Sequence, residues 1–370
     1  MRDGTERRRD GGRERVTRGD LFADRSVLTP SYVPERLPER AAHRRSIGSA
    51  LAGTESGTVA VVGRPGQGKT TTVGRVLDDR EGHTVTVSCA DGASVQRLAI
   101  ELHNELVPPG RRLGHSEARA RTAAADALRA SEATVALDDV DAIDAAALES
   151  FVTDVVDGRA PLVVVADSLQ FRNALSRSFR TDVIDDVVVF GPYERDQLRG
   201  IVERRTVTAF RPDVVESRAV DQIASFAADD GGDAGVAIEL LRHAGDVAVE
   251  RGDAAVRTAH VERASERYRT RRDEETVAAL SVHERATLAG LRALAGQDAT
   301  PSSFDAVIAA YRDVLADGQT TPNGRRSVRN YLERLREAGL VERHERAGRY
   351  EFSLSVAPSR LDALDGERWL

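Results

Sequence analysis

Short apolar runs alternate with longer stretches of helical spacing over the first half of the chain. The runs are TVAVV at 58–62, TVTVSCA at 84–90, TVALD at 134–138, PLVVVA at 161–166 and VVVF at 187–190. Continuous apolar runs of this length are typical of strands buried on both faces, whereas the stretch QRLAIELHNEL between two of them has the spacing of an amphipathic helix. The pattern predicts an α/β domain with a parallel sheet over residues 21–190.

The second half of the chain has a different pattern. Residues 191–272 carry helical spacing alone and predict a small all-α domain, and the charged stretch RTRRDEET at its end is expected to link it to the next domain. In residues 273–370, two helical stretches precede NGRRSVRNYLERLREAGL, and the alternating segment VERHERAGRYEFSLS turns at Ala347 and Gly348. Three helices and a hairpin predict a winged helix. The arginine-rich residues 1–20 lack apolar spacing and are expected to form a disordered tail.

The first apolar run leads into a phosphate-binding loop. Gly63, Gly68, Lys69 and Thr70 fit the pattern G-x-x-x-x-G-K-[ST], between a predicted strand and a predicted helix. Glycines allow backbone N–H groups to surround a β-phosphate, the helix start adds positive charge, the lysine neutralises β- and γ-oxygens, and the threonine hydroxyl ligates Mg²⁺. The loop predicts ATP or ADP with Mg²⁺ as ligands.

Lysine usage supports this interpretation. Of the 53 lysine and arginine residues in the chain, Lys69 is the only lysine. A compact ammonium is a point charge that fits among phosphate oxygens, which a planar guanidinium does not do equally well. A chain that uses arginine everywhere else therefore retains lysine where phosphate chemistry needs it.

A second element of the phosphate site follows the third apolar run. TVALDDVDAID places Asp138 and Asp139 at the end of a predicted buried strand. Asp138 can hold Mg²⁺, so the metal ligands are predicted to be Thr70 and Asp138, and the next acid can orient an attacking water. Asp139 stands where a longer glutamate is usual, which predicts slow hydrolysis.

Overall composition narrows the class of protein. The net charge is −7 with 60 acidic residues, which together with the lysine depletion indicates a halophilic source, although GC-rich coding also favours arginine. The chain has no long apolar stretch, so no membrane segment is predicted. Its single cysteine, Cys89, suits a buried core position in a cytoplasmic protein.

The last domain carries a local excess of positive charge. Between residues 321 and 350 there are eight arginines and four glutamates. Val328, Leu332 and Leu335, with Tyr331, share one face of the third helix and are expected to be buried. The predicted DNA-binding residues are those of the opposite face and of the hairpin tip, namely Arg325, Arg326, Arg329, Asn330, Arg336, Arg346 and Arg349.

The order of these segments resembles the archaeal replication initiators of the origin-recognition and cell-division-control type, which are AAA+ ATPases. The resemblance runs from Leu21 to the C-terminus and rests on YVPERLPER, GRPGQGKTTT, LDDVD, SLQFRNALSRSFR, FGPYERDQL and GDAGVAIELL. It implies a P-loop AAA+ base, an all-α lid over residues 191–272 and a C-terminal winged helix. It also implies that the nucleotide is bound by Gly63, Arg64, Pro65, Gly66, Gln67, Gly68, Lys69, Thr70, Thr71 and Tyr193.

Three departures from the family pattern concern the γ-phosphate. Asp139 is a shortened acid, Asp167 occupies the place of the first sensor, which is usually asparagine, and Gly235 occupies the place of the second-sensor arginine. A carboxylate cannot donate a hydrogen bond to phosphate and repels it. The resemblance places the arginine finger at Arg177 or Arg180. We expect nucleotide binding with weak turnover.

These observations predict an ATP/ADP-binding initiator that binds duplex origin repeats, with the replicative helicase and other initiator copies as further partners and no membrane partner. A divergent paralogue is favoured over the principal initiator. Two alternatives stay open: a nucleotide-binding transcription or plasmid-maintenance regulator, and a signalling ATPase whose winged helix contacts proteins.

Overall fold

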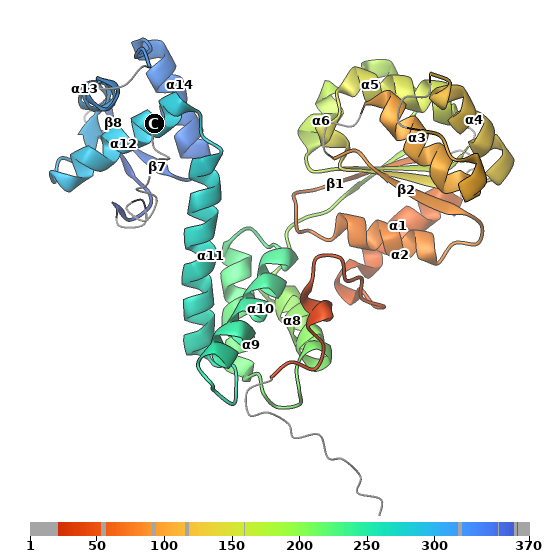
Figure 1. Ribbon diagram of the computed structural model, residues 1–370, viewed down its shortest axis with the longest axis horizontal. Coiled ribbons are helices and arrows are strands. Elements are labelled where there is room, and N and C mark those ends of the chain that lie inside the picture. Colours follow the sequence, from red (N-terminus) through yellow and green to blue (C-terminus); the bar gives the residue numbers. More distant parts are fainter. Residues whose placement is uncertain are drawn as a thin grey trace, which may run out of the picture. The chain divides into compact units, whose positions relative to one another are not determined.

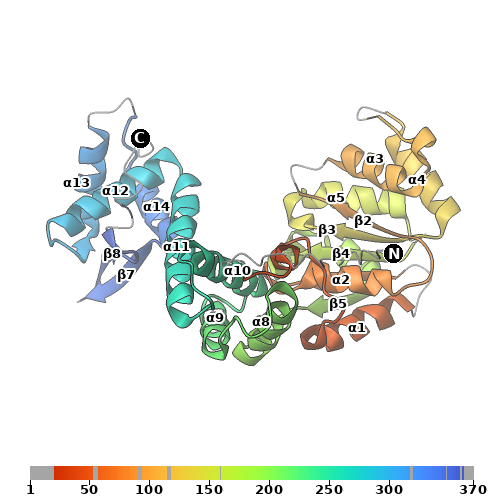
Figure 2. The same cartoon turned by 60° about the horizontal axis from the view of Figure 1, so that its bottom comes forward.

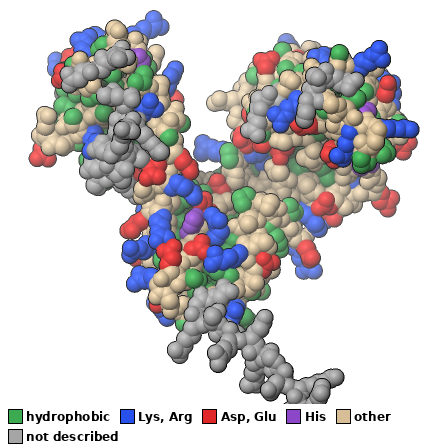
Figure 3. Space-filling model, viewed as in Figure 1, with side chains coloured by type: hydrophobic (Ala, Val, Ile, Leu, Met, Phe, Trp, Pro, Cys, Tyr) green, Lys and Arg blue, Asp and Glu red, His purple; other side chains and the backbone are tan. Residues whose placement is uncertain are grey.

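The computed structural model describes residues 21–52, 57–90, 94–114, 118–158, 160–316, 320–346, 348–358 and 361. The predicted tail at 1–20 lies outside these residues. The chain divides into two compact units, one ending at Val261 and the other beginning at Glu262. The helices of the described part include none that is long and apolar enough to cross a membrane. On the face seen in Figure 3, acidic and basic side chains are interspersed.

A five-stranded parallel sheet forms the centre of the first unit (Figure 1), with strand order β2-β3-β4-β1-β5. The strands are β1 (Thr58–Val62), β2 (Thr84–Ser88), β3 (Thr134–Asp138), β4 (Leu162–Ala166) and β5 (Asp186–Val189). This confirms the predicted α/β base. Because β4 lies between β3 and β1 and Val62 is opposite Ala166, the segments that follow these three strands meet at one edge of the sheet.

Helices cover both faces of this sheet (Figure 2). On one face lie α1 (Ala41–Ala52) and α2 (Lys69–Asp78), and on the other lie α3 (Val95–Leu106), α4 (Ala120–Ser131) and α5 (Ala145–Phe151). Shorter elements complete the base: η3 (Pro109–Arg111), η4 (Val140–Ala142), η5 (Val152–Val156), α6 (Leu169–Ala174) and α7 (Arg177–Asp182). Two-sided coverage explains why the strands are apolar without alternation.

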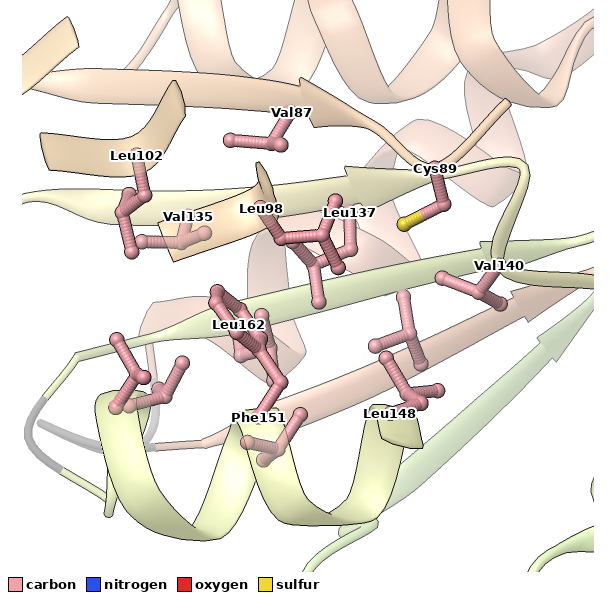
Figure 4. Packing of buried hydrophobic residues seen from close by; sticks show 14 of the residues in the cluster. Val87, Cys89, Leu98, Leu102, Val135, Leu137, Val140, Leu148, Phe151 and Leu162 are labelled. Atoms are coloured by element: carbon pink, nitrogen blue, oxygen red, sulfur yellow. The ribbon is translucent and has the colours of Figure 1, made fainter. Parts of the chain in front are cut away.

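The larger core cluster joins α3 and α5 to the sheet. Figure 4 shows Leu98 of α3 and Phe151 of α5 packed against the strand residues Leu137 and Leu162. Cys89 follows β2 in the same cluster and is fully buried, and burial raises the pKa of its thiol to about 12. The predicted buried core position of the cysteine is confirmed.

Four helices follow β5: α8 (Arg195–Ala209), α9 (Ser217–Asp229), α10 (Ala234–Glu250) and α11 (Thr258–Ala278). The predicted all-helical character of this region is confirmed. The charged stretch at 269–276, expected as a linker, lies within α11 and is helical. Arginine and glutamate are good helix formers, and the ion pair between Arg271 and Glu275 is an i,i+4 pair of the kind that stabilises helices.

The segment at 21–40, with η1 (Arg25–Leu28) and η2 (Pro38–Arg40), connects this helical part to the base. Phe22 pairs with Phe210 at the end of α8, and Arg205 of α8 donates a hydrogen bond of 2.9 Å to the Val27 carbonyl. Arg205 is 8% exposed. Its buried guanidinium is held by the Val27 carbonyl and by stacking on Tyr32. The segment therefore lies on the helical part before it enters the base at α1.

The second unit combines α12 (Val282–Gly296), α13 (Phe304–Leu315) and α14 (Arg325–Glu337) with a three-stranded antiparallel sheet. Its strands are β6 (Ser302–Ser303), β7 (Val341–Arg346) and β8 (Arg349–Leu354), in the order β6-β8-β7. The predicted hairpin is confirmed, with Arg346 opposite Arg349 and Gly348 at a φ of 73°. Val328, Leu332 and Leu335 of α14 are buried as predicted, and Tyr331 is half-buried.

Candidate nucleotide site and candidate DNA-binding surface

The loop between β1 and α2 has the shape of a phosphate cradle. Gly66 and Gly68 have φ values of 74° and 77°, in the left-handed region that favours glycine. A Cβ atom at Gly66 would collide with the Asp233 carboxylate, and one at Gly68 would collide with the Tyr193 hydroxyl. At Gly63 a Cβ atom would lie 2.6 Å from the Phe190 carbonyl oxygen. The glycines are therefore required by the backbone and by its close neighbours.

Lys69 begins α2 and is only 6% exposed. Its ammonium donates hydrogen bonds to the Arg64 carbonyl at 3.0 Å and to Asp167 Oδ1 at 2.8 Å. Asp167 directly follows β4, so the neighbouring positions of β1 and β4 bring the two side chains together. The structure thus places the predicted first-sensor residue in an ion pair with the phosphate-loop lysine.

Asp138, at the end of β3, is 9% exposed and shares a side-chain hydrogen bond with Thr70. Burial raises the pKa of the Asp138 carboxyl, an effect that the Thr70 hydrogen bond opposes. A hydroxyl and a carboxylate held together at the start of α2 are hard oxygen ligands, so the pair fits Mg²⁺ as predicted from the sequence.

Asp139 has a φ of 56° and lies in the left-handed region. Aspartate is among the residues that tolerate this conformation best, which gives a backbone reason for aspartate at this position. A third acid, Asp141, was missed in the sequence although it completes the LDDVD segment. Its carboxylate accepts a hydrogen bond from the Asp167 backbone N–H, and burial raises the pKa of Asp141.

The helical part contacts the phosphate loop directly. The backbone N–H of Ala234, the first residue of α10, donates to the Gly66 carbonyl at 3.1 Å. The Asp233 carboxylate caps the same helix, accepting from the backbone N–H groups of Gly235 at 2.6 Å and Val236 at 3.2 Å. Gly235, in the place of the second-sensor arginine, brings no side chain to this contact.

A cavity of about 540 Å³ adjoins the loop. It is lined by the 27–40 segment, by α8, by the start of α10 and by Tyr193, which is 5% exposed. The Arg40 guanidinium lies 3.7 Å from the centre of the Tyr193 ring and donates to the Gln67 and Gly191 carbonyls at 3.0 and 2.7 Å. The sequence analysis did not predict a role for Arg40, and the only signal for it was its position at the end of the segment YVPERLPER. The cavity has the size of a small-molecule site and opens onto Gly68 and Thr71.

The two arginine-finger candidates lie on α7. Arg177 is exposed and Arg180 is half-buried. Neither forms an ion pair within the described part of the chain, so both guanidinium groups are available to an external partner.

The arginines of the second unit differ in how they are held. Arg325 pairs with Asp305, Arg336 pairs with Glu333 at 2.9 Å, and Arg346 lies 3.9 Å from Glu351. Arg329 stacks on Phe304 at 5.2 Å. These side chains are exposed as predicted, and three of them have carboxylate partners.

Arg326, Arg349 and Asn330 are also exposed. Over the described residues, Arg326 and Arg349 form no ion pair. An arginine without a carboxylate partner offers its full charge to a phosphate or a base edge. These two side chains are therefore the most available cations of the predicted surface.

A polar network missed in the sequence supports the loop before α14. Fully buried Tyr311 accepts a hydrogen bond of 2.8 Å from the backbone N–H of Asn323, and its hydroxyl lies 2.9 Å from His283 Nδ1. The Asn323 side chain donates to the Tyr331 hydroxyl at 2.7 Å. The network fixes the chain where it enters the arginine-bearing helix.

Two family models match the chain. The model of an AAA domain matches residues 53–175, and the model of a Cdc6 AAA+ ATPase-type lid domain matches residues 199–266. The fold and the phosphate site thus define an AAA+ protein with a Cdc6-type lid.

Full-length relatives narrow this class. The chain is 29% identical over 362 residues to ORC1-type DNA replication protein 8 of Halobacterium salinarum, with 90% of each chain covered. It is 25% identical over 370 residues to ORC1-type DNA replication protein 15 of Haloarcula marismortui, with 91% of this chain and 90% of the relative covered. The chain is therefore similar over about 90% of its length to ORC1-type DNA replication proteins, and the halophilic relatives agree with its acidic composition.

Solved structures of archaeal ORC proteins share the fold of this chain. The structure of Aeropyrum pernix ORC1 in complex with DNA matches with a TM-score of 0.75 and 25% identity over 93% of this chain and 96% of that one. The Aeropyrum pernix ORC2 protein, solved as ADPNP-ADP complexes, shares the fold with a TM-score of 0.63 and 20% identity over 93% of this chain and 97% of that one.

Proposed function

We propose that this protein is a replication initiator that binds ATP or ADP in its AAA+ base and duplex origin DNA through a C-terminal winged helix, and that it helps to load the replicative helicase. The observation that carries the proposal is the match over 93% of the chain to an ORC1 protein solved with DNA. The altered γ-phosphate residues favour a divergent paralogue over the principal initiator.

The DNA-binding role is assigned to α14 and the hairpin. An exposed helix of this size fits the major groove, where arginine donates to guanine and asparagine to adenine. Arg326, Arg329 and Asn330 are exposed on the helix, and Arg349 is exposed at the hairpin tip. The arginines that carry carboxylate partners, Arg325, Arg336 and Arg346, contribute less because each must exchange an ion pair for a phosphate.

The nucleotide role is assigned to the phosphate loop and the adjoining cavity. Lys69 would neutralise phosphate charge, the backbone of 63–68 would surround the β-phosphate, and the cavity beside Tyr193 and Arg40 would take the base and sugar. Thr70 and Asp138 would hold Mg²⁺, which supplies further charge neutralisation at the phosphates. Asp139 would orient water, and Arg177 or Arg180 would act on a neighbouring copy.

Selection from a library of genome-derived duplex fragments, at high KCl, tests the DNA role. The protein is compared with an Arg326→Ala, Arg329→Ala double variant, and with Arg312→Ala as a control from an exposed position on α13. We expect inverted repeats beside replication start sites to be enriched by the protein and by the control, and to be lost in the double variant.

Two other results would change the proposal. Enrichment of promoter fragments alone would favour a transcription regulator. No enriched sequence with any of the three proteins would make the second unit a protein-contact domain and would exclude origin binding.

A further inference from the structure

Most of the hydrogen-bond donors of the Lys69 ammonium already bond to acceptors within the protein. An ammonium has three N–H donors and no acceptor. One donates to the Arg64 carbonyl at 3.0 Å and one to Asp167 Oδ1 at 2.8 Å. The remaining donor can serve one phosphate oxygen, whereas bridging β- and γ-phosphates requires two.

Asp167 is held in its position by its own backbone. Its N–H donates to the Asp141 carboxylate, and its place at the end of β4 is fixed by the pairing of β4 with β1. The side chain of Asp167 is 44% exposed, whereas that of Lys69 is 6% exposed, so the ion pair joins a buried ammonium to a carboxylate that is open to solvent. A γ-phosphate would either displace the Asp167 carboxylate from Lys69 or lie next to it and be repelled by its negative charge.

The lid residues that contact the phosphate loop bring no positively charged side chain to it. The lid arginines Arg204 and Arg205 line the adjoining cavity, where Arg204 pairs with Glu39 and Arg205 donates to the Val27 carbonyl. The lid approaches the loop through Ala234 N–H and the Gly66 carbonyl, and Asp233 lies against Gly66. Gly235 adds no cation. This contact between lid and loop is therefore complete without a γ-phosphate.

We propose that Asp167 is a specificity-determining residue that makes the site selective for nucleoside diphosphates over nucleoside triphosphates. The inference rests on the proposed nucleotide binding and deepens it. A diphosphate uses the free donor of Lys69 and the loop backbone while the ion pair with Asp167 persists. A triphosphate adds negative charge next to an acceptor-only carboxylate and loses affinity.

The test is competitive displacement of a fluorescent ADP from the full-length protein by ADP, ATP and non-hydrolysable ADPNP, at high KCl with Mg²⁺. The variants are Asp167→Asn, Asp167→Ala and the control Asp126→Asn. The control removes the same charge from an exposed carboxylate on α4 that pairs with Arg129.

We expect the wild type to bind ADP roughly tenfold or more tightly than ADPNP, because one added like charge at contact distance is worth at least that factor. In both Asp167 variants the ratio should fall towards one through stronger ADPNP binding, with ADP affinity little changed. The control should keep the wild-type ratio. A thermal unfolding shift that is larger with ADP than with ADPNP gives a second readout, since ligand stabilisation follows affinity.

Equal wild-type affinities for ADP and ADPNP would overturn the selectivity while leaving nucleotide binding intact. Binding of neither nucleotide would instead overturn the proposed phosphate site. If the ratio of ADP affinity to ADPNP affinity were unchanged in both Asp167 variants, Asp167 would not be the cause of the selectivity.

Discussion

Lys69 shows why residue type matters at the phosphate loop. It is the single lysine of a 370-residue chain, it is 6% exposed, and its ammonium fits between the Arg64 carbonyl and Asp167. A guanidinium is larger and planar, so it cannot occupy the same space with the same donors. The common exchange of lysine for arginine is therefore not conservative here.

We predict that Lys69→Arg weakens ADP binding by roughly a hundredfold, as expected for the loss of a charge-assisted hydrogen bond in a buried site. Isothermal titration with ADP measures the effect, and Arg312→Lys serves as the control for the reverse exchange. ADP affinity within threefold of the wild type would contradict the assigned role of Lys69.

The γ-phosphate residues predict slow turnover. Asp139 is one methylene shorter than glutamate, and Asp167 cannot donate to a γ-phosphate. We expect steady-state ATP hydrolysis well below about one per second, the lower end of typical enzyme rates. Asp139→Glu alone should change little, because glutamate fits the φ of 56° less well and Asp167 remains. Combining it with Asp167→Asn should raise the rate, and a wild-type rate of several per second would contradict the account.

The sequence alone predicts the identity of most site residues but not their partners. The motif around Lys69 and the acids after β3 are local patterns, so one sequence suffices to find them. The ion pair between Lys69 and Asp167 depends on β4 lying beside β1. No local sequence pattern predicts this strand order. The same reason hides Arg40, whose contacts with Gln67 and Tyr193 join distant segments.

At the scale of elements, α14 depends on the loop that precedes it. Tyr311 accepts from the Asn323 backbone N–H and contacts His283, and both groups lie in a partly buried setting. Removing the hydroxyl leaves the Asn323 N–H without its acceptor, which costs about 1–3 kcal/mol for a buried donor.

We predict that Tyr311→Phe increases amide hydrogen exchange at residues 320–324 and reduces DNA affinity, while the fold of the second unit is kept. Tyr331→Phe is the matched control, because it removes only the acceptor of the Asn323 side chain. Equal exchange in the two variants would mean that the network does not position α14.

The ion pairs of the arginines give a second prediction for α14. Arg326 has no carboxylate partner in the described chain, whereas Arg336 is held by Glu333. Arg326→Ala should therefore weaken DNA binding more than Arg336→Ala, and it should lower the slope of log affinity against log salt by about 0.9. Binding isotherms at several KCl concentrations measure both effects, and a larger loss for Arg336→Ala would contradict the ranking.

Elements were predicted where a regular pattern specifies them. The five apolar strands and the amphipathic α14 are of this kind. The charged stretch at 269–276 was expected as a linker because it lacks apolar residues, yet it continues α11, since helix propensity and i,i+4 ion pairs do not need an apolar face. The short strand β6 has two residues and gives no pattern at all.

At the scale of the whole molecule, an acidic chain carries a locally basic segment, which is the proposed DNA-binding surface. The net charge is −7, whereas residues 321–350 hold twice as many arginines as glutamates. In concentrated salt the sequence-independent attraction to phosphates is weak, so base contacts and DNA deformation must supply more of the binding free energy. We therefore expect site-specific binding to persist at salt concentrations that abolish non-specific binding.

The most direct test of the initiator function is the position of the protein on the genome of its host. Chromatin immunoprecipitation of the wild type and of the Arg326→Ala, Arg329→Ala variant is compared with replication start sites mapped by marker frequency. The account predicts wild-type peaks at one or more start sites and their loss in the variant. Peaks confined to promoters away from every start site would contradict it.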